Sequence, residues 1–256
     1  MSLVRPTVAA LLVTHQSERW IRDVIASIQG QTLAPDALFC VDDHSTDSTV
    51  GLLNESGFEI FQSTSSGTDA TTRIAQNFLQ GVRAARRYDV VVLGDHDDYW
   101  LPDRVEHQVR VLQDQPDAWM VASDGRVMGS NEMLRATFPI PDDWENMSRL
   151  ARFRYAMRHS IATGGASAVR PSMLLDPSNG ATPVPSGWLH DRWWSLAAVA
   201  DDAIVLDRYP VIEYRVQSEQ QVGLDTGRQG TRIPRIGISD VTRTRDVARL
   251  LRRSRR

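Results

Sequence analysis

Three aspartates follow a short apolar run in the segment GDHDDYWLPDR. Residues 90–93 are apolar, and Asp95, Asp97 and Asp98 come directly after them. Such a run indicates a strand buried on both faces, and in open α/β sheets ligands bind at the carboxyl ends of such strands. No Arg or Lys lies among the three carboxylates, which would repel one another. A divalent cation with oxygen ligands, Mg²⁺ or Mn²⁺, would relieve that repulsion; a solvated acidic turn is the alternative.

A second pair of acids also follows an apolar run. Residues 37–41 predict a strand, and Asp42 and Asp43 end it. Since parallel strands present their carboxyl ends at one edge of a sheet, this pair and the GDHDD cluster can converge on one crevice. Taken alone, Asp42 and Asp43 fit helix capping and turn formation better than a binding site, and their pairing with GDHDD reverses that preference.

Strand and helix patterns alternate through the first 120 residues. The expected strands are residues 7–14, 37–41, 58–61, 90–93 and 118–122, and the expected helices are about 20–28, 46–56, 70–86 and a helix that begins at Pro102. Ser17 is the expected cap of the first helix, and Ser45 or Thr46 that of the second. This alternation predicts an α/β fold, a Rossmann-like, mostly parallel sheet flanked by helices.

The pattern becomes less regular after residue 123. We expect helices over residues 144–159 and 188–200, short strands over 203–206 and 211–215, and loops rich in small residues at 162–167 and 177–187. There is no internal repeat and no sharp boundary before residue 225.

The composition is that of a globular protein. The chain has 256 residues, 41% of them hydrophobic, and no apolar run approaches the roughly 20 residues that span a bilayer. With no leader-like N-terminus either, the expected location is cytoplasmic. Cys40 is the single cysteine, which excludes an internal disulfide and a cysteine-based zinc site. All 29 basic residues are Arg, which excludes a lysine-dependent mechanism.

The net charge of −3 is unevenly distributed. Residues 226–256 contain ten Arg against Asp240 and Asp246, a charge of about +8, which leaves about −11 on residues 1–225. Within residues 236–256, Ile238, Val241, Val247, Leu250 and Leu251 form a modest apolar face. They predict a basic helix lying on an anionic membrane surface; a solvated terminal charge run is the alternative.

Five segments, in order, resemble the family-2 glycosyltransferases, inverting enzymes with a GT-A fold. They are VTHQSERWIRDVIASIQGQTLAPDALFCVDDHSTDST, GDHDDYWLPDRVEHQ, ATGGASAVR, GWLHDRWW and YRVQSEQQVG. The second is similar to the form found in rhamnosyltransferase-like members. The resemblance covers about residues 7–223. It implies a GT-A domain over residues 1–225, with nucleotide-sugar binding in 1–122, acceptor binding in 123–225 and the basic tail beyond.

The resemblance also implies a donor pocket. Its expected donor-binding residues are Thr14, Asp42, Asp43, Arg73, Asp95 and Asp97. Asp97 and Asp98, in the position of the family's DXD motif, would hold Mg²⁺ or Mn²⁺, which stabilises the departing diphosphate. For Arg73 an exposed helical position is the alternative.

Asp191 stands where the family has its general base, which takes the proton of the acceptor hydroxyl in a single displacement. The expected acceptor-binding residues are Gly164, Gly165, His190 and Trp193, although tryptophans at helical spacing are commonly core residues. Departures from the family pattern are His44, His96, Gln217 and Gln220. Gln217 replaces a histidine that helps to hold the metal or diphosphate in relatives, and an amide is a poorer metal ligand.

The implied activity is metal-assisted, inverting sugar transfer from a nucleoside diphosphate-sugar to a carbohydrate, lipid-linked or small-molecule acceptor. It would serve cell-envelope polysaccharide, glycolipid or secondary-metabolite glycosylation, in the cytoplasm or at the inner face of the membrane, with no nucleic acid partner. A nucleotide-sugar-binding protein without transferase activity is the alternative that Gln217 suggests. A metal-dependent phosphohydrolase would need a nucleophile and a Lys or Ser/Thr context that the Asp cluster lacks.

Overall fold

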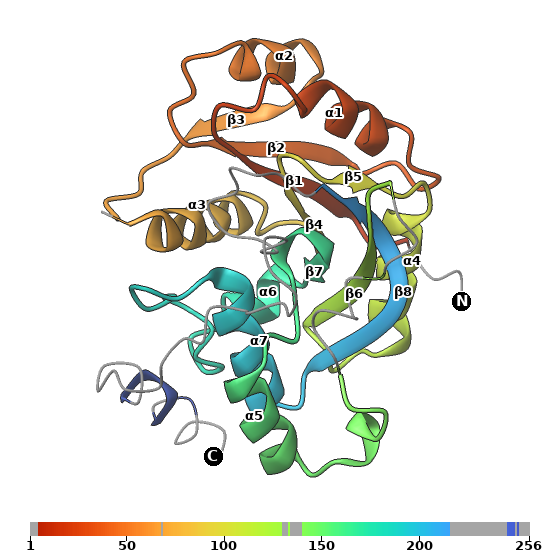
Figure 1. Cartoon of the computed structure of the whole chain (residues 1–256), viewed down its shortest axis with the longest axis vertical. Helices are drawn as coiled ribbons and strands as arrows, with labels where there is room; N and C mark the ends of the chain where they lie inside the picture. Colours follow the sequence, from red (N-terminus) through yellow and green to blue (C-terminus); the bar gives the residue numbers. More distant parts are fainter. Residues whose placement is uncertain are drawn as a thin grey trace.

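A mixed eight-stranded sheet forms the centre of the computed structural model, which describes residues 5–67, 69–129, 133, 140–215, 245–248 and 250 (Figure 1). The strand order is β3-β2-β1-β4-β7-β6-β8-β5. The strands are β1 (Val8–Thr14), β2 (Ala37–Asp42), β3 (Glu59–Gln62), β4 (Val90–Asp95), β5 (Tyr99–Trp100), β6 (Met120–Val127), β7 (Ser167–Val169) and β8 (Ile204–Tyr214). The predicted α/β fold is confirmed.

Strands β1 to β4 are parallel and bring their carboxyl ends to one edge. Every residue of β1 is buried, because β2 pairs with it on one side and β4 on the other. The register sets Thr14 opposite Asp42 and Val13 opposite Asp95. The two predicted groups of acids therefore follow neighbouring positions of the same sheet edge.

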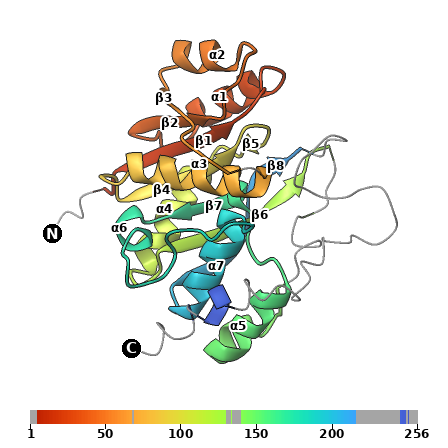
Figure 2. The same ribbon diagram turned by 90° about the vertical axis from the view of Figure 1, so that its left-hand side faces the viewer.

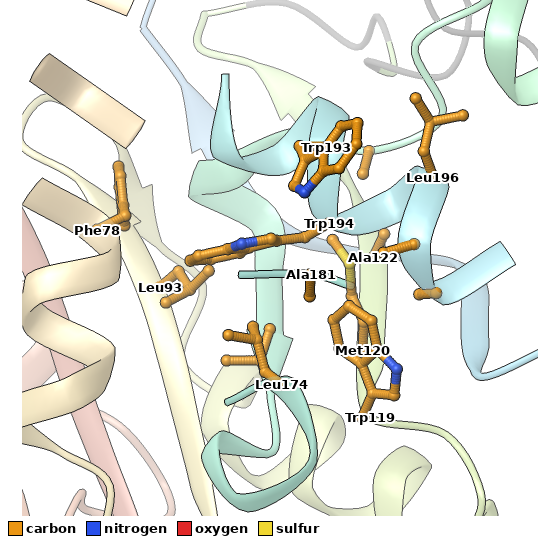
Figure 3. Packing of buried hydrophobic residues seen from close by; sticks show 14 of the residues in the cluster. Phe78, Leu93, Trp119, Met120, Ala122, Leu174, Ala181, Trp193, Trp194 and Leu196 are labelled. Atoms are coloured by element: carbon orange, nitrogen blue, oxygen red, sulfur yellow. The ribbon is translucent and has the colours of Figure 1, made fainter. Parts of the chain in front are cut away.

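Helices cover both faces of the sheet (Figures 1 and 2). They are α1 (Ile21–Gln29), α2 (Thr49–Glu55), α3 (Ala70–Ala84), α4 (Arg104–Asp114), α5 (Arg149–Arg158), α6 (Pro171–Leu174) and α7 (His190–Ala200), with 3-10 turns η2 (Trp144–Asn146) and η3 (Gly164–Ala166). Successive side chains of β1 point to opposite faces of the sheet. Leu11 belongs to the cluster that contains Phe78 of α3 and Trp194 of α7, which Figure 3 shows, whereas Leu12 belongs to the cluster with residues of α1, α2 and α4.

The second half of the sheet differs from the expectation. Strand β7, which the sequence did not predict, lies antiparallel between β4 and β6. The two short strands expected over 203–206 and 211–215 are one strand, β8, which pairs with β6 through two irregularities near Asp124. Strand β5 pairs with Ile212 and Glu213, so the part of β8 around Asp207 and Arg208 is an edge that solvent reaches.

Several helix starts also need correction. Helix α4 begins at Arg104 rather than Pro102, and the helix expected over 144–159 is the turn η2 followed by α5, whose first turn Ser148 caps. Ser17 does not cap α1 with its side chain, because its hydroxyl bonds back to His15. Ser45 does not cap α2, because its amide and hydroxyl both donate to Asp42.

The basic tail is described only at residues 245–248 and 250, where two of its apolar side chains pack on the protein. Val247 is 9% exposed and Leu250 is 2% exposed, and both belong to the core cluster that includes α5 and α7. Apolar side chains packed on the body of the protein are not available to lipid. Ile238, Val241 and Leu251 lie outside the described residues. No helix in the described part of the chain has the length and hydrophobicity to cross a bilayer.

Candidate active site

The acidic cluster lies where β4 ends and the chain turns back into β5. Asp95 is the last residue of β4 and keeps some exposure, Asp97 is 8% exposed and Asp98 is completely buried. The turn is held in place because Trp100, two residues later, is buried against the face of the sheet that α1 and α4 cover. Apolar packing on both sides of the turn thus fixes three carboxylates at the carboxyl edge of the sheet.

The η3 turn brings two glycines onto this cluster. A Cβ atom on Gly165 would lie 2.7 Å from Oδ2 of both Asp95 and Asp98, so only glycine permits the approach. The backbone amide of Gly164 donates a 3.1 Å hydrogen bond to Asp191 Oδ2. Gly164 and Gly165 therefore join Asp191, at the start of α7, to the acids that follow β4.

The electrostatics of the cluster favour protonated carboxyl groups. Burial, and then the charges of Asp97 and Asp191, raise the pKa of Asp95 to about 7. Burial, followed by the charges of Asp97 and Asp95, raises the pKa of Asp98 well above its usual value. Burial raises the pKa of Asp191 to about 6, although two backbone hydrogen bonds oppose the rise. Cations are therefore favoured at this site.

One cation lies beneath the cluster, which corrects the prediction that none accompanies it. Arg104, the first residue of α4, is completely buried and lies 3.9 Å from the centre of the Trp100 ring. It donates to the Leu93 carbonyl and to Gln108 Oε1. Burial lowers the Arg104 pKa to about 9, while its charge lowers the pKa values of Asp95 and Asp98. One guanidinium does not neutralise three carboxylates.

One carboxylate oxygen of Asp98 has no hydrogen-bond partner among the described residues. Its Oδ1 accepts a 3.2 Å hydrogen bond from the Arg215 amide, whereas its buried Oδ2 has no hydrogen-bond partner among the described residues. A buried, unsatisfied carboxylate oxygen is costly, and a divalent cation would satisfy it. No three His, Cys, Asp or Glu side chains of the described chain form a ready ligand set. A cation here fits the Mg²⁺ pattern of one or two carboxylates plus phosphate and water oxygens.

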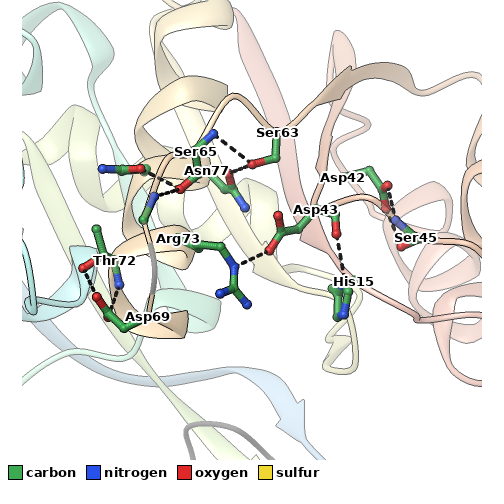
Figure 4. Close-up of polar contacts among 12 residues, drawn as sticks. His15, Asp42, Asp43, Ser45, Ser63, Ser65, Asp69, Thr72, Arg73 and Asn77 are labelled. Atoms are coloured by element: carbon green, nitrogen blue, oxygen red, sulfur yellow. Dashed lines mark hydrogen bonds and ion pairs between the residues drawn. The ribbon is translucent and has the colours of Figure 1, made fainter.

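At the end of β2, the two expected donor-binding acids have different positions (Figure 4). Asp42 is completely buried and accepts hydrogen bonds from Thr14 Oγ1 at 2.8 Å and from the amide and hydroxyl of Ser45. Asp43 instead pairs with Arg73 Nε of α3 at 3.1 Å, and the Arg73 side chain is 32% exposed. Thr14 and Asp42 are thus buried and hold the loop after β2 through these hydrogen bonds, while Asp43 and Arg73 lie nearer the surface.

A polar loop before α3 forms part of the same region, and the sequence did not indicate its role. Ser63 Oγ donates to Asn77 Oδ1 at 2.5 Å and Ser65 Oγ donates to Gln76 Oε1 at 2.6 Å. Asp69 caps α3 by accepting from the Thr72 amide (Figure 4). The run QSTSSGTD predicts only a loop, because hydrogen bonds between its serines and the following helix leave no periodic pattern in the sequence.

His190 and Trp193, which are expected to contact the acceptor, both lie buried in the core. The His190 ring stacks on Phe78 with 3.8 Å between centroids, and burial lowers its pKa to about 3. Trp193 is 3% exposed, and its Nε1 donates to the Gly180 carbonyl at 3.2 Å. Both are buried because every residue of α7 except Asp191 is buried. Figure 3 shows Trp193 within this packing.

Two of the four residues that depart from the family pattern lie among the described residues. His44 adopts a φ of 58°, the left-handed conformation that glycine favours, which accounts for the glycine usual at that position in the resembling family. His96 is partly exposed beside the acidic turn. Gln217 and Gln220 lie outside the described residues. Sequence reasoning missed Arg104 and Arg215, although both stand inside the quoted segments GDHDDYWLPDRVEHQ and YRVQSEQQVG.

Comparisons with known proteins identify the family of the chain. The model of the glycosyl transferase family 2 matches residues 10–175. The dTDP-rhamnosyl transferase RfbG of Shigella flexneri is 22% identical over 228 residues, which are 83% of this chain and 73% of that protein.

Among solved structures, S. aureus TarS 1-349 in complex with UDP-GlcNAc has a TM-score of 0.60 at 16% identity, over 84% of this chain and 60% of that one. Glucosyl-3-phosphoglycerate synthase from Mycobacterium tuberculosis, in complex with Mn²⁺, UDP and glucosyl-3-phosphoglycerate, has a TM-score of 0.55 at 19% identity, over 83% and 73%. These likenesses confirm the GT-A type of sheet. Since the family match covers more than half of its residues, the chain belongs to glycosyl transferase family 2.

Proposed function

We propose that this chain transfers a sugar, as a hexosyltransferase, from a nucleoside diphosphate-sugar to an acceptor hydroxyl with inversion, and that Asp191 is the general base. The observation that carries the proposal is the hydrogen bond from Gly164 to Asp191, because it sets this carboxylate beside Asp95 and Asp98. A carboxylate whose pKa is raised to about 6 suits proton removal near neutral pH.

Asp191 is held for this role by the backbone. Its Oδ2 accepts from the Gly164 amide, and its Oδ1 accepts from the Arg192 amide at 2.6 Å. The side chain keeps some exposure, whereas the rest of α7 is buried. An acceptor hydroxyl can therefore approach this carboxylate without displacing the core, and the proton of the hydroxyl passes to it as the new glycosidic bond forms.

The donor would lie across the carboxyl edge of the parallel strands. Arg73 and Asp43 bound the end of β2, and Arg73 can counter the charge of the diphosphate. Asp98 Oδ2 and Asp97 would hold a divalent cation, Mg²⁺ or Mn²⁺. Such a cation supplies Lewis-acid stabilisation to the departing diphosphate.

The donor and metal classes rest on the relatives. RfbG is named for dTDP-rhamnose, TarS was solved with UDP-GlcNAc, and the mycobacterial synthase with Mn²⁺ and UDP. The chain spans 60% of the length of TarS 1-349, so the acceptor is proposed only as a carbohydrate, lipid-linked or small-molecule hydroxyl. The predicted role in cell-envelope polysaccharide, glycolipid or secondary-metabolite glycosylation belongs to this proposal, as does the predicted place in the cytoplasm or at the inner membrane face.

Thermal melting with UDP, GDP or dTDP, each with and without Mn²⁺, is the first test. A ligand that binds only the native chain raises the melting temperature as its concentration exceeds its dissociation constant. We expect one nucleotide to stabilise the chain only when Mn²⁺ is present, and its sugar conjugate then to yield a product with the inverted anomeric configuration. Product with retained configuration would contradict the mechanism. Donor binding without transfer to any acceptor would favour the nucleotide-sugar-binding alternative.

A further inference from the structure

Arg215 connects the end of β8 to the acidic turn through its backbone and its side chain. Its amide donates to Asp98 Oδ1 at 3.2 Å, and its Nε donates to the Asp97 carbonyl at 3.1 Å. The two contacts follow from strand register: Tyr99 pairs with Glu213 in the antiparallel β5–β8 ladder, so Arg215 falls opposite Asp97. The ladder itself ends at Tyr99, and these two hydrogen bonds continue it across the acidic turn.

The other side of the Arg215 guanidinium rests on the N-terminal end of α1. Its Cζ lies 4.2 Å from the centre of the Trp20 ring, and its Nη2 lies 3.6 Å from Asp23 Oδ2. The Arg215 side chain is 17% exposed, which strengthens its contact with the Trp20 ring, whereas the Asp23 side chain is 65% exposed and solvent screens the ion pair. A planar guanidinium can stack and donate in its plane at the same time, which a lysine cannot do.

We propose that Arg215 is a positioning residue, which clamps the Asp97–Asp98 turn to α1 and so fixes the direction of Asp98 Oδ2. A carboxylate is planar, so once the Arg215 amide holds Oδ1, the turn determines where Oδ2 points. Oδ2 is the oxygen that lies against Gly165 and has no partner among the described residues. The consequence for cation binding rests on the proposed function, whereas the clamp itself does not.

Arg19 provides a matched control. Its Cζ also lies 4.2 Å from the centre of the Trp20 ring, so both guanidiniums use the same platform. Arg215 in addition donates hydrogen bonds to Asp97 and Asp98. Arg215→Gln and Arg19→Gln therefore remove the same charge and the same type of ring contact, and differ in the connection to the acidic turn.

Hydrogen–deuterium exchange of the full chain, without ligand, tests the clamp. Backbone amides exchange when a segment opens locally. We expect Arg215→Gln to speed exchange about tenfold or more in peptides covering residues 95–100. Arg19→Gln should leave these peptides unchanged, and peptides of α4 and β1 should be unchanged in both variants. Equal exchange of residues 95–100 in the two variants would overturn the proposal. If Arg215→Gln does not fold, Trp20→Leu removes the platform instead and should loosen the same peptides.

Binding of Mn²⁺, measured from the electron paramagnetic resonance of the free ion, tests the consequence. Replacing a residue that orients a metal ligand typically weakens metal binding about 10–100-fold. Arg215→Gln should therefore raise the Mn²⁺ dissociation constant by about that factor. Arg215→Lys should recover only part of the loss, and Arg19→Gln should match the unaltered chain. Equal affinities in all variants would contradict the positioning role. If the unaltered chain binds no Mn²⁺, the metal part of the proposed function fails, and the exchange comparison alone decides the clamp.

Discussion

Gly165 lies so close to Asp98 that a Cβ atom at residue 165 would stand 2.7 Å from Asp98 Oδ2. The same atom would stand 2.7 Å from Asp95 Oδ2. Since Gly165 belongs to the η3 turn and Asp98 to the turn after β4, their contact joins two segments that lie far apart in the sequence. The site therefore requires glycine at residue 165.

Gly165→Ala should impair sugar transfer while the chain still folds. The added methyl group would push Asp95 and Asp98 away by a fraction of an ångström or more, and misplacement on this scale can lower turnover about 100-fold. Gly51→Ala is the control, because a Cβ at this position of α2 meets nothing within 4 Å and alanine favours a helix. Turnover should be measured beside thermal melting, and full activity of Gly165→Ala would refute the close approach.

Asp191→Asn should abolish the base and preserve the donor site. Asparagine keeps the shape of the side chain and can still accept the Gly164 hydrogen bond, but it cannot take a proton from the acceptor. We expect turnover to fall about 10²–10⁴-fold with the nucleotide dissociation constant nearly unchanged. Asp201→Asn, at the opposite end of α7 with a burial-raised pKa of about 6 as well, should keep its activity. Calorimetry and turnover on the same samples separate the two effects.

The rate of transfer should rise with pH and level off above about pH 6. Burial raises the Asp191 pKa to about 6, and only the deprotonated carboxylate accepts the acceptor proton. Below that value kcat should therefore fall about tenfold for each pH unit. A profile that is flat between pH 5 and 8 at saturating donor would show that Asp191 is not the base.

The sequence predicted which strand ends carry the acids of the site better than it predicted the side chains that surround those acids. Apolar runs that end in acids identified β2 and β4, because a strand buried on both faces leaves a clear pattern, and parallel pairing then placed Asp42 and Asp95 at one edge. An apolar run followed by two acids does not indicate which of the two, Asp42 or Asp43, is buried. Asp42 does so because Thr14 and Ser45 bind it, and Ser45 had been assigned to a helix cap.

Long-range contacts were beyond local patterns. Arg104 and Arg215 reach the acidic turn from α4 and from the end of β8, so no spacing within GDHDD indicates them. His190 and Trp193 were expected at the acceptor because they stand beside Asp191 in the sequence. In a helix buried on nearly all sides, neighbours in sequence face different parts of the core.

Without divalent cations, the stability of the chain should decrease as pH rises from about 4 to 7. The Asp95 pKa is raised from 3.8 to about 7, so between these values the folded chain binds more protons than the unfolded chain, and stability falls as those protons leave. Asp95→Asn should make the decrease of the melting temperature shallower. Asp142→Asn, whose side chain is 97% exposed, should leave the slope unchanged. Identical slopes for all three proteins would mean that Asp95 titrates normally.

Leu250→Ala should destabilise the protein even though the residue lies in the basic tail. Leu250 is 2% exposed and packs in the core cluster with α7, so its truncation leaves a cavity and should lower the free energy of unfolding by about 2–5 kcal/mol. Leu150→Ala is the matched control, because Leu150 of α5 is 50% exposed and its truncation should change stability by less than about 0.5 kcal/mol. Urea unfolding of the full chain compares the two. A tail helix that lies on a membrane instead would make the two truncations equally mild, since neither leucine would then be buried in the protein.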